Sequence, residues 1–183
     1  MSPAKEALGA IIATDSYHFP VLVVLVLMSI GLAIKSGLYP FHSWMPDAYG
    51  YSTASASAIL SGLVSKAYII LLIKIFYRVV GIDFIVTSKM MNVLFVFGLV
   101  GMIMGSVSAI LEKDIRRMIA FSSVAQIGYI YMGIGLGIEQ GYVAAVYHIL
   151  HHAATKALLF ISVVGLSNVS GGSKQFPDLR GAG

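Results

Sequence analysis

The sequence predicts an all-α polytopic membrane protein. A mean hydropathy of +0.88, with 58% hydrophobic and 11% charged residues, lies outside the range of soluble globular domains. Apolar stretches of about 20 residues, the length that crosses a bilayer as a helix, recur between residues 19 and 168. A secretory signal peptide is a single short apolar stretch near the N-terminus, so it does not explain this pattern.

Five transmembrane helices are expected in order. They cover residues 19–49, 52–80, 91–111, 115–138 and 140–168. The domain organisation is then a partly polar N-terminal segment (1–18), a five-helix membrane domain (19–168), and a Gly- and Ser-rich connecting loop or truncated end (169–183). Lys and Arg are almost equally divided between the two predicted sides, so the sequence does not decide the orientation.

The first helix is predicted to be discontinuous near Pro40. Proline removes a backbone donor and clashes with the carbonyl four residues earlier, so a helix passing through it kinks or unwinds. Lys35 lies about one turn before this break. Carbonyls freed in a broken membrane helix are tolerated only inside protein or beside water, which favours an ion site. In the alternative, Pro40 simply ends the helix and the aromatic residues after it anchor the chain at the interface.

The second helix begins with alternating Ser and Ala residues and continues with Ser61, Gly62 and Ser65. Small residues let helix backbones approach closely, so this face is expected to pack against protein. Lys66 follows directly and is therefore expected in a polar, closely packed environment. Lys74 lies near the helix end, where its side chain can reach the interface.

The third helix (91–111) is expected from its apolar run alone. The fourth helix (115–138) follows a loop of alternating charges. The fourth helix also carries a serine pair, Ser122 and Ser123. Taken alone, these features favour an anchored loop over a functional site.

The fifth helix carries His148, His152 and Lys156 at spacings of four, which places them on one stripe along which a proton can pass. His151 is expected to point elsewhere. A metal is not expected, because no carboxylate or thiolate lies in this helix to complete a coordination shell. A structural role, in which each imidazole bonds to a carbonyl or hydroxyl, is the alternative.

Charge and composition limit the remaining classes of function. Lys35, Lys66 and Lys156 interrupt apolar runs that contain no carboxylate, and ionisable groups at membrane depth generally mark functional sites. The chain has no cysteine, which excludes thiolate metal sites and iron–sulfur ligation, so no cofactor is expected in it and any redox centre belongs to a partner. The net charge of +4 comes from scattered basic residues, so nucleic-acid binding is not expected.

Four segments together resemble the antiporter-like subunits shared by respiratory complex I, Mrp-type sodium/proton antiporters and membrane-bound hydrogenases. They are Lys-Ser…Pro-Phe-His-Ser-Trp-Met-Pro-Asp-Ala (35–48), the helix around Lys66, Lys-Asp-Ile-Arg-Arg…Phe-Ser-Ser…Gln-Ile-Gly-Tyr (113–129), and His…His…Lys-Ala-Leu-Leu-Phe (148–160). They occur in the family's order and cover nearly the whole chain.

The resemblance implies proton translocation along a hydrophilic axis halfway across the membrane. On this axis Lys35 resembles the lysine of the broken helix and Lys66 the central lysine of the next helix, while His148, His152 and Lys156 resemble the outward-leading part. It also implies other membrane subunits as partners, protons or sodium as the transported ions, and a bacterial or archaeal cytoplasmic membrane. The chain would hold no redox centre even as a subunit of an NADH:quinone oxidoreductase-type enzyme.

The chain lacks parts of the family's pattern. Full members have a glutamate that pairs with the broken-helix lysine in an upstream helix, and a second broken helix downstream; neither lies in these 183 residues. The chain therefore resembles part of one module. Three alternatives stay open: a subunit of a redox-driven pump, a subunit of a sodium/proton antiporter, and an inert structural subunit.

Overall fold

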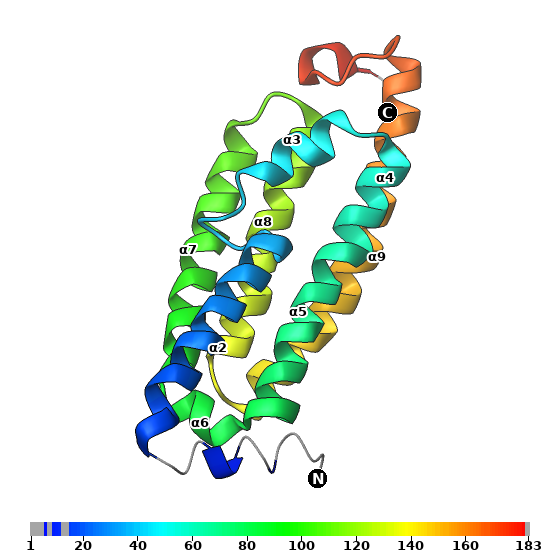
Figure 1. The fold of residues 1–183 in the computed structure, drawn as a ribbon. Coiled ribbons are helices and arrows are strands. Elements are labelled where there is room, and N and C mark those ends of the chain that lie inside the picture. Colours follow the sequence, from blue (N-terminus) through cyan, green and yellow to red (C-terminus); the bar gives the residue numbers. More distant parts are fainter. Residues whose placement is uncertain (1–5, 7–8, 12–14, 182–183) are drawn as a thin grey trace.

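The computed structural model describes residue 6, residues 9–11 and residues 15–181, and these form helices joined by short loops (Figure 1). The predicted N-terminal segment over 1–18 falls largely outside the described residues. The elements are α2 (Asp15–Ser36), α3 (Trp44–Tyr51), α4 (Ala54–Ile59), the π-helix η1 (Leu60–Val64), α5 (Ser65–Lys74), the π-helix η2 (Ile75–Val80), α6 (Ile82–Thr87), α7 (Met90–Leu111), α8 (Ile115–Gly135), α9 (Glu139–Val169) and the 3₁₀ helix η3 (Phe176–Leu179).

Five segments in the described part of the chain are long and apolar enough to cross a membrane. They are Phe19–Ser36, Ala54–Val80, Met90–Leu111, Ile115–Gly135 and Glu139–Val169. The predicted all-α fold with five transmembrane helices is thus confirmed. The short helix α6 between the second and third spans was not predicted.

The helices form one elongated bundle in which α8 is central (Figure 1). Helix α8 packs against α7 on one side and α9 on the other, while α4, η1 and α5 form a single rod that follows α9. Helix α2 packs on α5, and α3 crosses the end of the bundle against α8. The central place of α8 is reflected in its burial, because 67% of its apolar span is enclosed, against 22% for the spans in α2 and α7.

Glycines determine how closely α7 approaches α8. Gly98, Gly101 and Gly105 of α7 are buried, and Gly128 of α8 lies against the same surface. A Cβ added to Gly98 would lie only 2.5 Å from the backbone nitrogen of Met132. Helices in lipid gain little from hydrophobic burial against each other, so their association depends on close packing of this kind.

The break in the first helix begins at Gly37. This residue has φ +81°, and the N–H groups of Leu38 and Gly37 donate to the carbonyls of Ala33 (3.0 Å) and Ile34 (3.3 Å). This is the Schellman pattern that ends helices at a left-handed glycine. The predicted discontinuity near Pro40 is confirmed, although Gly37 ends α2 and Pro40 lies inside the turn that follows.

The second span is less regular than the single helix predicted over residues 52–80. In η1 the backbone N–H of Ser65 donates to the carbonyl of Leu60, a π-helical bond that widens the turn. Such insertions occur often at functional sites, and this one immediately precedes Lys66.

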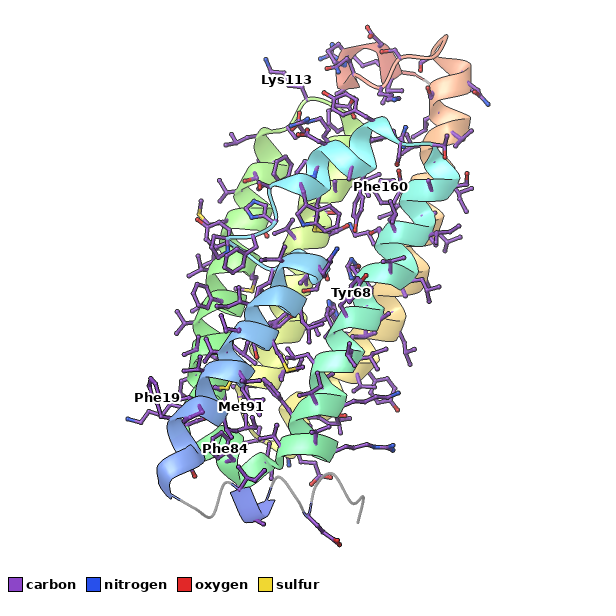
Figure 2. All side chains as sticks on the ribbon, viewed as in Figure 1. Phe19, Tyr68, Phe84, Met91, Lys113 and Phe160 are labelled. Carbon is purple, nitrogen blue, oxygen red and sulfur yellow. The ribbon has the colours of Figure 1, made fainter. Side chains whose placement is uncertain are left out.

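Exposed apolar side chains cover the outside of the bundle. Phe19, labelled in Figure 2, points away from α2 and is 74% exposed. Phe160 of α9 instead points inward, where its ring lies edge-on to Tyr49 of α3 with centroids 5.9 Å apart. This contact joins the α9 side of the bundle to the segment after the break.

We expect Gly98→Ala to lower the free energy of unfolding, because the added methyl group would force α7 away from α8. Overpacking of this kind costs about 1–3 kcal/mol. Gly165 of α9 is the matched control, since no neighbouring atom lies within 4 Å of its Cβ position, and Gly165→Ala should be neutral or stabilising by up to about 1 kcal/mol. Unfolding by SDS in mixed micelles measures both, and equal effects would contradict the glycine contact.

Candidate functional site

Lys66 lies inside the bundle, near the middle of the second span. Its side chain is 2% exposed, and its ammonium donates to the carbonyl oxygen of Ser61 and to the hydroxyl of Ser65. Both acceptors belong to the same rod: Ser61 lies in the π-helical turn η1, and Ser65 is the first residue of α5. No carboxylate pairs with Lys66 among the ion pairs of the described residues.

Lys156 belongs to α9 and is also buried, against α8. It is 3% exposed, and its ammonium donates to the carbonyl oxygen of Ile119 (3.1 Å) and to the hydroxyl of Ser122. Helix α8 therefore supplies the acceptors for a lysine that belongs to α9. Lys156 also has no carboxylate partner in the described part of the chain.

Serine hydroxyls connect the surroundings of the two lysines. The hydroxyls of Ser61 and Ser123 are 3.2 Å apart, and Ser123 also donates to the Ile119 carbonyl (3.0 Å), which accepts from Lys156. Polar contacts thus run from the turn that precedes Lys66, by way of groups on α8, to Lys156. The sequence analysis did not assign the serine pair of α8 to a functional site. The feature that could have indicated it is the presence of two hydroxyls in an otherwise apolar helix.

His148 and His152 stack on the stripe predicted for them. Their ring centroids are 6.2 Å apart at an interplanar angle of 15°. His152 is 2% exposed, and neither of its ring nitrogens has a hydrogen-bond partner among the described residues. A purely structural role would require that the imidazole of His152 bond to a carbonyl or a hydroxyl. No such bond is found among the described residues. His152 is close enough to interact electrostatically with both Lys66 and Lys156.

A small polar cavity of about 220 Å³ opens beside this group on the α8–α9 side. It is lined by Ser122, Gln126, His151, His152, Thr155, Lys156 and Leu159. His151, which the spacing rule placed away from the relay stripe, thus lines the same cavity as His152 and Lys156. Through this cavity, the buried residues His152 and Lys156 are connected to the outer face of the bundle.

Lys35 lies apart from the other candidate residues. Its side chain is exposed on α2, and no hydrogen bond or ion pair joins it to another described residue. Its neighbour Ser36 points inward instead, where its hydroxyl lies 2.9 Å from that of Tyr131. The structure therefore groups Lys66, His148, His152 and Lys156 and leaves Lys35 on the outer face.

Arg116 connects the start of α8 to the end of the broken helix. It is 6% exposed, and its guanidinium donates to the carbonyl of Tyr49 (3.1 Å), the carbonyl of Ser52 and the hydroxyl of Ser57 (2.9 Å). The last carbonyls of a helix have no partner within the helix and attract a cation. Arg116 satisfies this need for α3 and holds the start of the second span.

Arg117 makes a second connection on the outside of the same joint. It forms ion pairs with Asp47 (2.6 Å) and Glu112 (3.1 Å). Burial by itself would raise the pKa of Glu112, but hydrogen bonds from Arg117 and from the backbone N–H groups of Lys113 and Asp114 outweigh it and lower that pKa. Glu112 therefore stays charged and paired at neutral pH.

The fold and the site together define a polytopic helical membrane protein with a buried cluster of lysines, histidines and serines near mid-membrane depth. No group of three or more His, Asp or Glu residues in the described part of the chain is placed to hold a metal ion. The family model for the transmembrane region of NADH:quinone oxidoreductase and Mrp antiporter subunits matches residues 7–181. The chain belongs to this family.

Known relatives and solved structures agree with this assignment. The chain is 38% identical over 147 residues to NADH-quinone oxidoreductase subunit N of Desulforudis audaxviator, covering 80% of this chain and 29% of that protein. It is 34% identical over 135 residues to chloroplastic NAD(P)H-quinone oxidoreductase subunit 5 of Nuphar advena, covering 74% and 17%. The chain thus spans less than a third of the length of these relatives.

Among solved structures, a chain of the Mrp complex from a Dietzia species superposes with a TM-score of 0.79 at 31% identity, covering 90% of this chain and 29% of that one. A chain of an archaeal membrane-bound sulfane sulfur reductase superposes with a TM-score of 0.74 at 29% identity, covering 84% and 31%. The integral membrane location predicted from the sequence is confirmed by the family and by the spanning helices.

We expect Arg116→Ala to destabilise the joint between α3 and α4 by about 2–5 kcal/mol, because buried carbonyl and hydroxyl acceptors lose a charged donor. Arg117→Ala is the control, since Asp47 is 64% exposed and exposed ion pairs contribute about 1 kcal/mol or less. SDS unfolding, combined with limited proteolysis at residues 52–53, measures both. A larger loss for Arg117→Ala would contradict the assigned role of Arg116.

Proposed function

We propose that this chain is a proton-conducting part of an antiporter-like membrane subunit, with Lys66, His152 and Lys156 as the central groups and His148 beside them. The observation that carries the proposal is the burial of two lysines, one in the α4–η1–α5 rod and one in the adjoining α9, with no carboxylate partner in the described residues. An isolated charge in a low-dielectric interior is costly, so such groups favour exchange of protons over permanent charge.

Electrostatic repulsion supplies the physical basis for transfer. Lys66 and Lys156 are close enough to interact, and two positive charges in a medium of low dielectric repel strongly. A proton that arrives on one lysine therefore disfavours a proton on the other. His152 interacts with both lysines, and its ring nitrogens have no bond to any described protein group that would hold a proton in place.

Lys35 enters the proposal in a different way. Its ammonium lies on the outer face of α2, directly before the break. We propose that it joins the relay only within the complete membrane assembly. This accords with the partners implied by the relatives, which are subunits of multi-subunit complexes.

The favoured setting is a redox-driven complex of the NADH:quinone oxidoreductase type, because the curated relatives described above carry that name. In that setting the chain moves protons and the electron-transfer centres belong to other subunits. The alternative is an Mrp-type sodium/proton antiporter, which the similarity to the Dietzia Mrp complex supports. The buried lysines and histidines serve either setting.

The central test is Lys66→Ala in the complete assembly, reconstituted in proteoliposomes. We expect proton translocation to fall to background while assembly is unchanged, because the buried cation is lost. Lys74→Ala, in the same rod but near the end of its span, is the control and should retain translocation. Full translocation by the Lys66 variant, measured with a pH-sensitive dye, would refute the role of this residue.

The two settings differ in their response to sodium. For the redox-driven pump we expect quinone reduction to drive acidification in sodium-free buffer. For the antiporter, an imposed pH gradient should drive sodium-22 movement without any electron donor. Sodium movement that survives complete removal of electron donors would exclude the redox-driven setting in favour of the alternative.

A further inference from the structure

A second polar cavity lies at the α3 end of the bundle, away from the lysine cluster. It encloses about 180 Å³ and is lined by Ala54, Arg116, Val163, Val164, Ser167, Asn168 and Lys174. Two of these side chains are cations, and two others carry a hydroxyl or an amide. The proton-relay proposal does not use this cavity.

The two cations of the cavity form no ion pair with a carboxylate among the described residues. The ion pairs found among the described residues belong to Arg117, and neither Arg116 nor Lys174 takes part in them. Asp114 is near enough to interact with Arg116, but its Oδ1 accepts the backbone N–H groups at the start of α8. Although the terminal guanidinium nitrogen of Arg116 is fully engaged with α3 and α4, its buried Nε has no hydrogen-bond partner in the described part of the chain.

The position of Lys174 at the cavity is determined by the backbone. The carbonyl of Lys174 accepts the N–H of Ile115 (3.0 Å), and Gln175 forms a β-bridge with Asp114. The segment after α9 therefore folds back onto the start of α8. This connection brings a second positive charge to the wall that already contains Arg116.

The cavity lies at one end of the candidate membrane spans. Ala54 is the first residue of its span and Arg116 the second residue of its own, while Ser167 is two residues before the end of α9. Val164, which lines the cavity, is 42% exposed on the outer face of α9. With these spans placed across a bilayer, the apolar wall would face the lipid tails and the basic and polar groups would lie at headgroup depth.

We propose that this cavity binds the phosphate group of an anionic phospholipid. Lys174 and Arg116 provide the positive charge, Ser167 and Asn168 provide neutral donors, and the valines of α9 contact the adjoining acyl chain. Basic pockets between helices at a membrane surface suit lipid phosphates in this way, and hydrogen bonds from charged donors to phosphate oxygens are strong. A free phosphate ion would satisfy the same donors but would leave the apolar wall without a partner.

The test uses the complete assembly in neutral detergent, delipidated and then labelled with a photoreactive phosphatidylglycerol. We expect crosslinks in peptides that contain residues 163–174, and competition by unlabelled phosphatidylglycerol but not by phosphatidylcholine. Lys174→Gln should weaken this labelling about tenfold, since the charge-assisted bond is lost, and Lys174→Arg should retain it. Lys113→Gln is the matched control, because Lys113 is exposed on the same surface and lies outside the cavity (Figure 2).

Three results would overturn the proposal. The first is wild-type labelling of the 163–174 peptides by Lys174→Gln, and the second is an equal loss in Lys113→Gln, which would indicate general surface attraction. The third is full displacement by millimolar inorganic phosphate without any preference among lipids, which would assign the cavity to a free ion. If Lys174→Gln fails to assemble, Ser167→Ala provides the same comparison, with reduced labelling expected and unchanged labelling contradicting the site.

Discussion

The arrangement of this bundle depends on the need to satisfy two buried ammonium groups without carboxylates. Lys66 takes its acceptors from its own rod, at and just after the π-helical turn, and Lys156 takes its acceptors from α8. An unpaired charge inside a membrane protein is tolerated only with such hydrogen bonds. Helix α8 must therefore lie against the adjoining rod and α9, with Ser123 facing Ser61 and Ser122 facing Lys156. Its other side remains available for close packing, and there the glycines of α7 meet it.

The broken first helix imposes a second requirement at the end of the bundle. A helix that stops inside the protein leaves carbonyls without partners, and Arg116 supplies the donors for the last turn of α3. The same guanidinium bonds to Ser57 at the start of the second span. One side chain from α8 thus holds both the end of the broken helix and the beginning of the rod that carries Lys66, so the position of the lysine cluster depends on this joint.

The length of the apolar runs and the position of Pro40 were sufficient to predict most of the fold. The five spans, their approximate ends and the discontinuity near Pro40 follow from apolar runs of bilayer length and from proline chemistry. The π-helical turns and α6 were not predicted, because a π turn leaves no change in hydrophobicity and a short apolar segment after a span resembles a loop. Gly37 was visible in the sequence, but its left-handed conformation depends on the turn that follows it.

The sequence by itself determined which residues carry charge at membrane depth, because an ammonium or imidazole within a run of apolar residues is evident from composition and spacing alone. Only the tertiary structure decided which of them meet. His148, His152 and Lys156 share a stripe by helical geometry. The contact of Ser61 with Ser123, the contact of Lys156 with Ser122 and the exposed position of Lys35 depend instead on how separate helices rotate against each other. That rotation is decided by close packing between helix surfaces, which no single segment of the chain encodes.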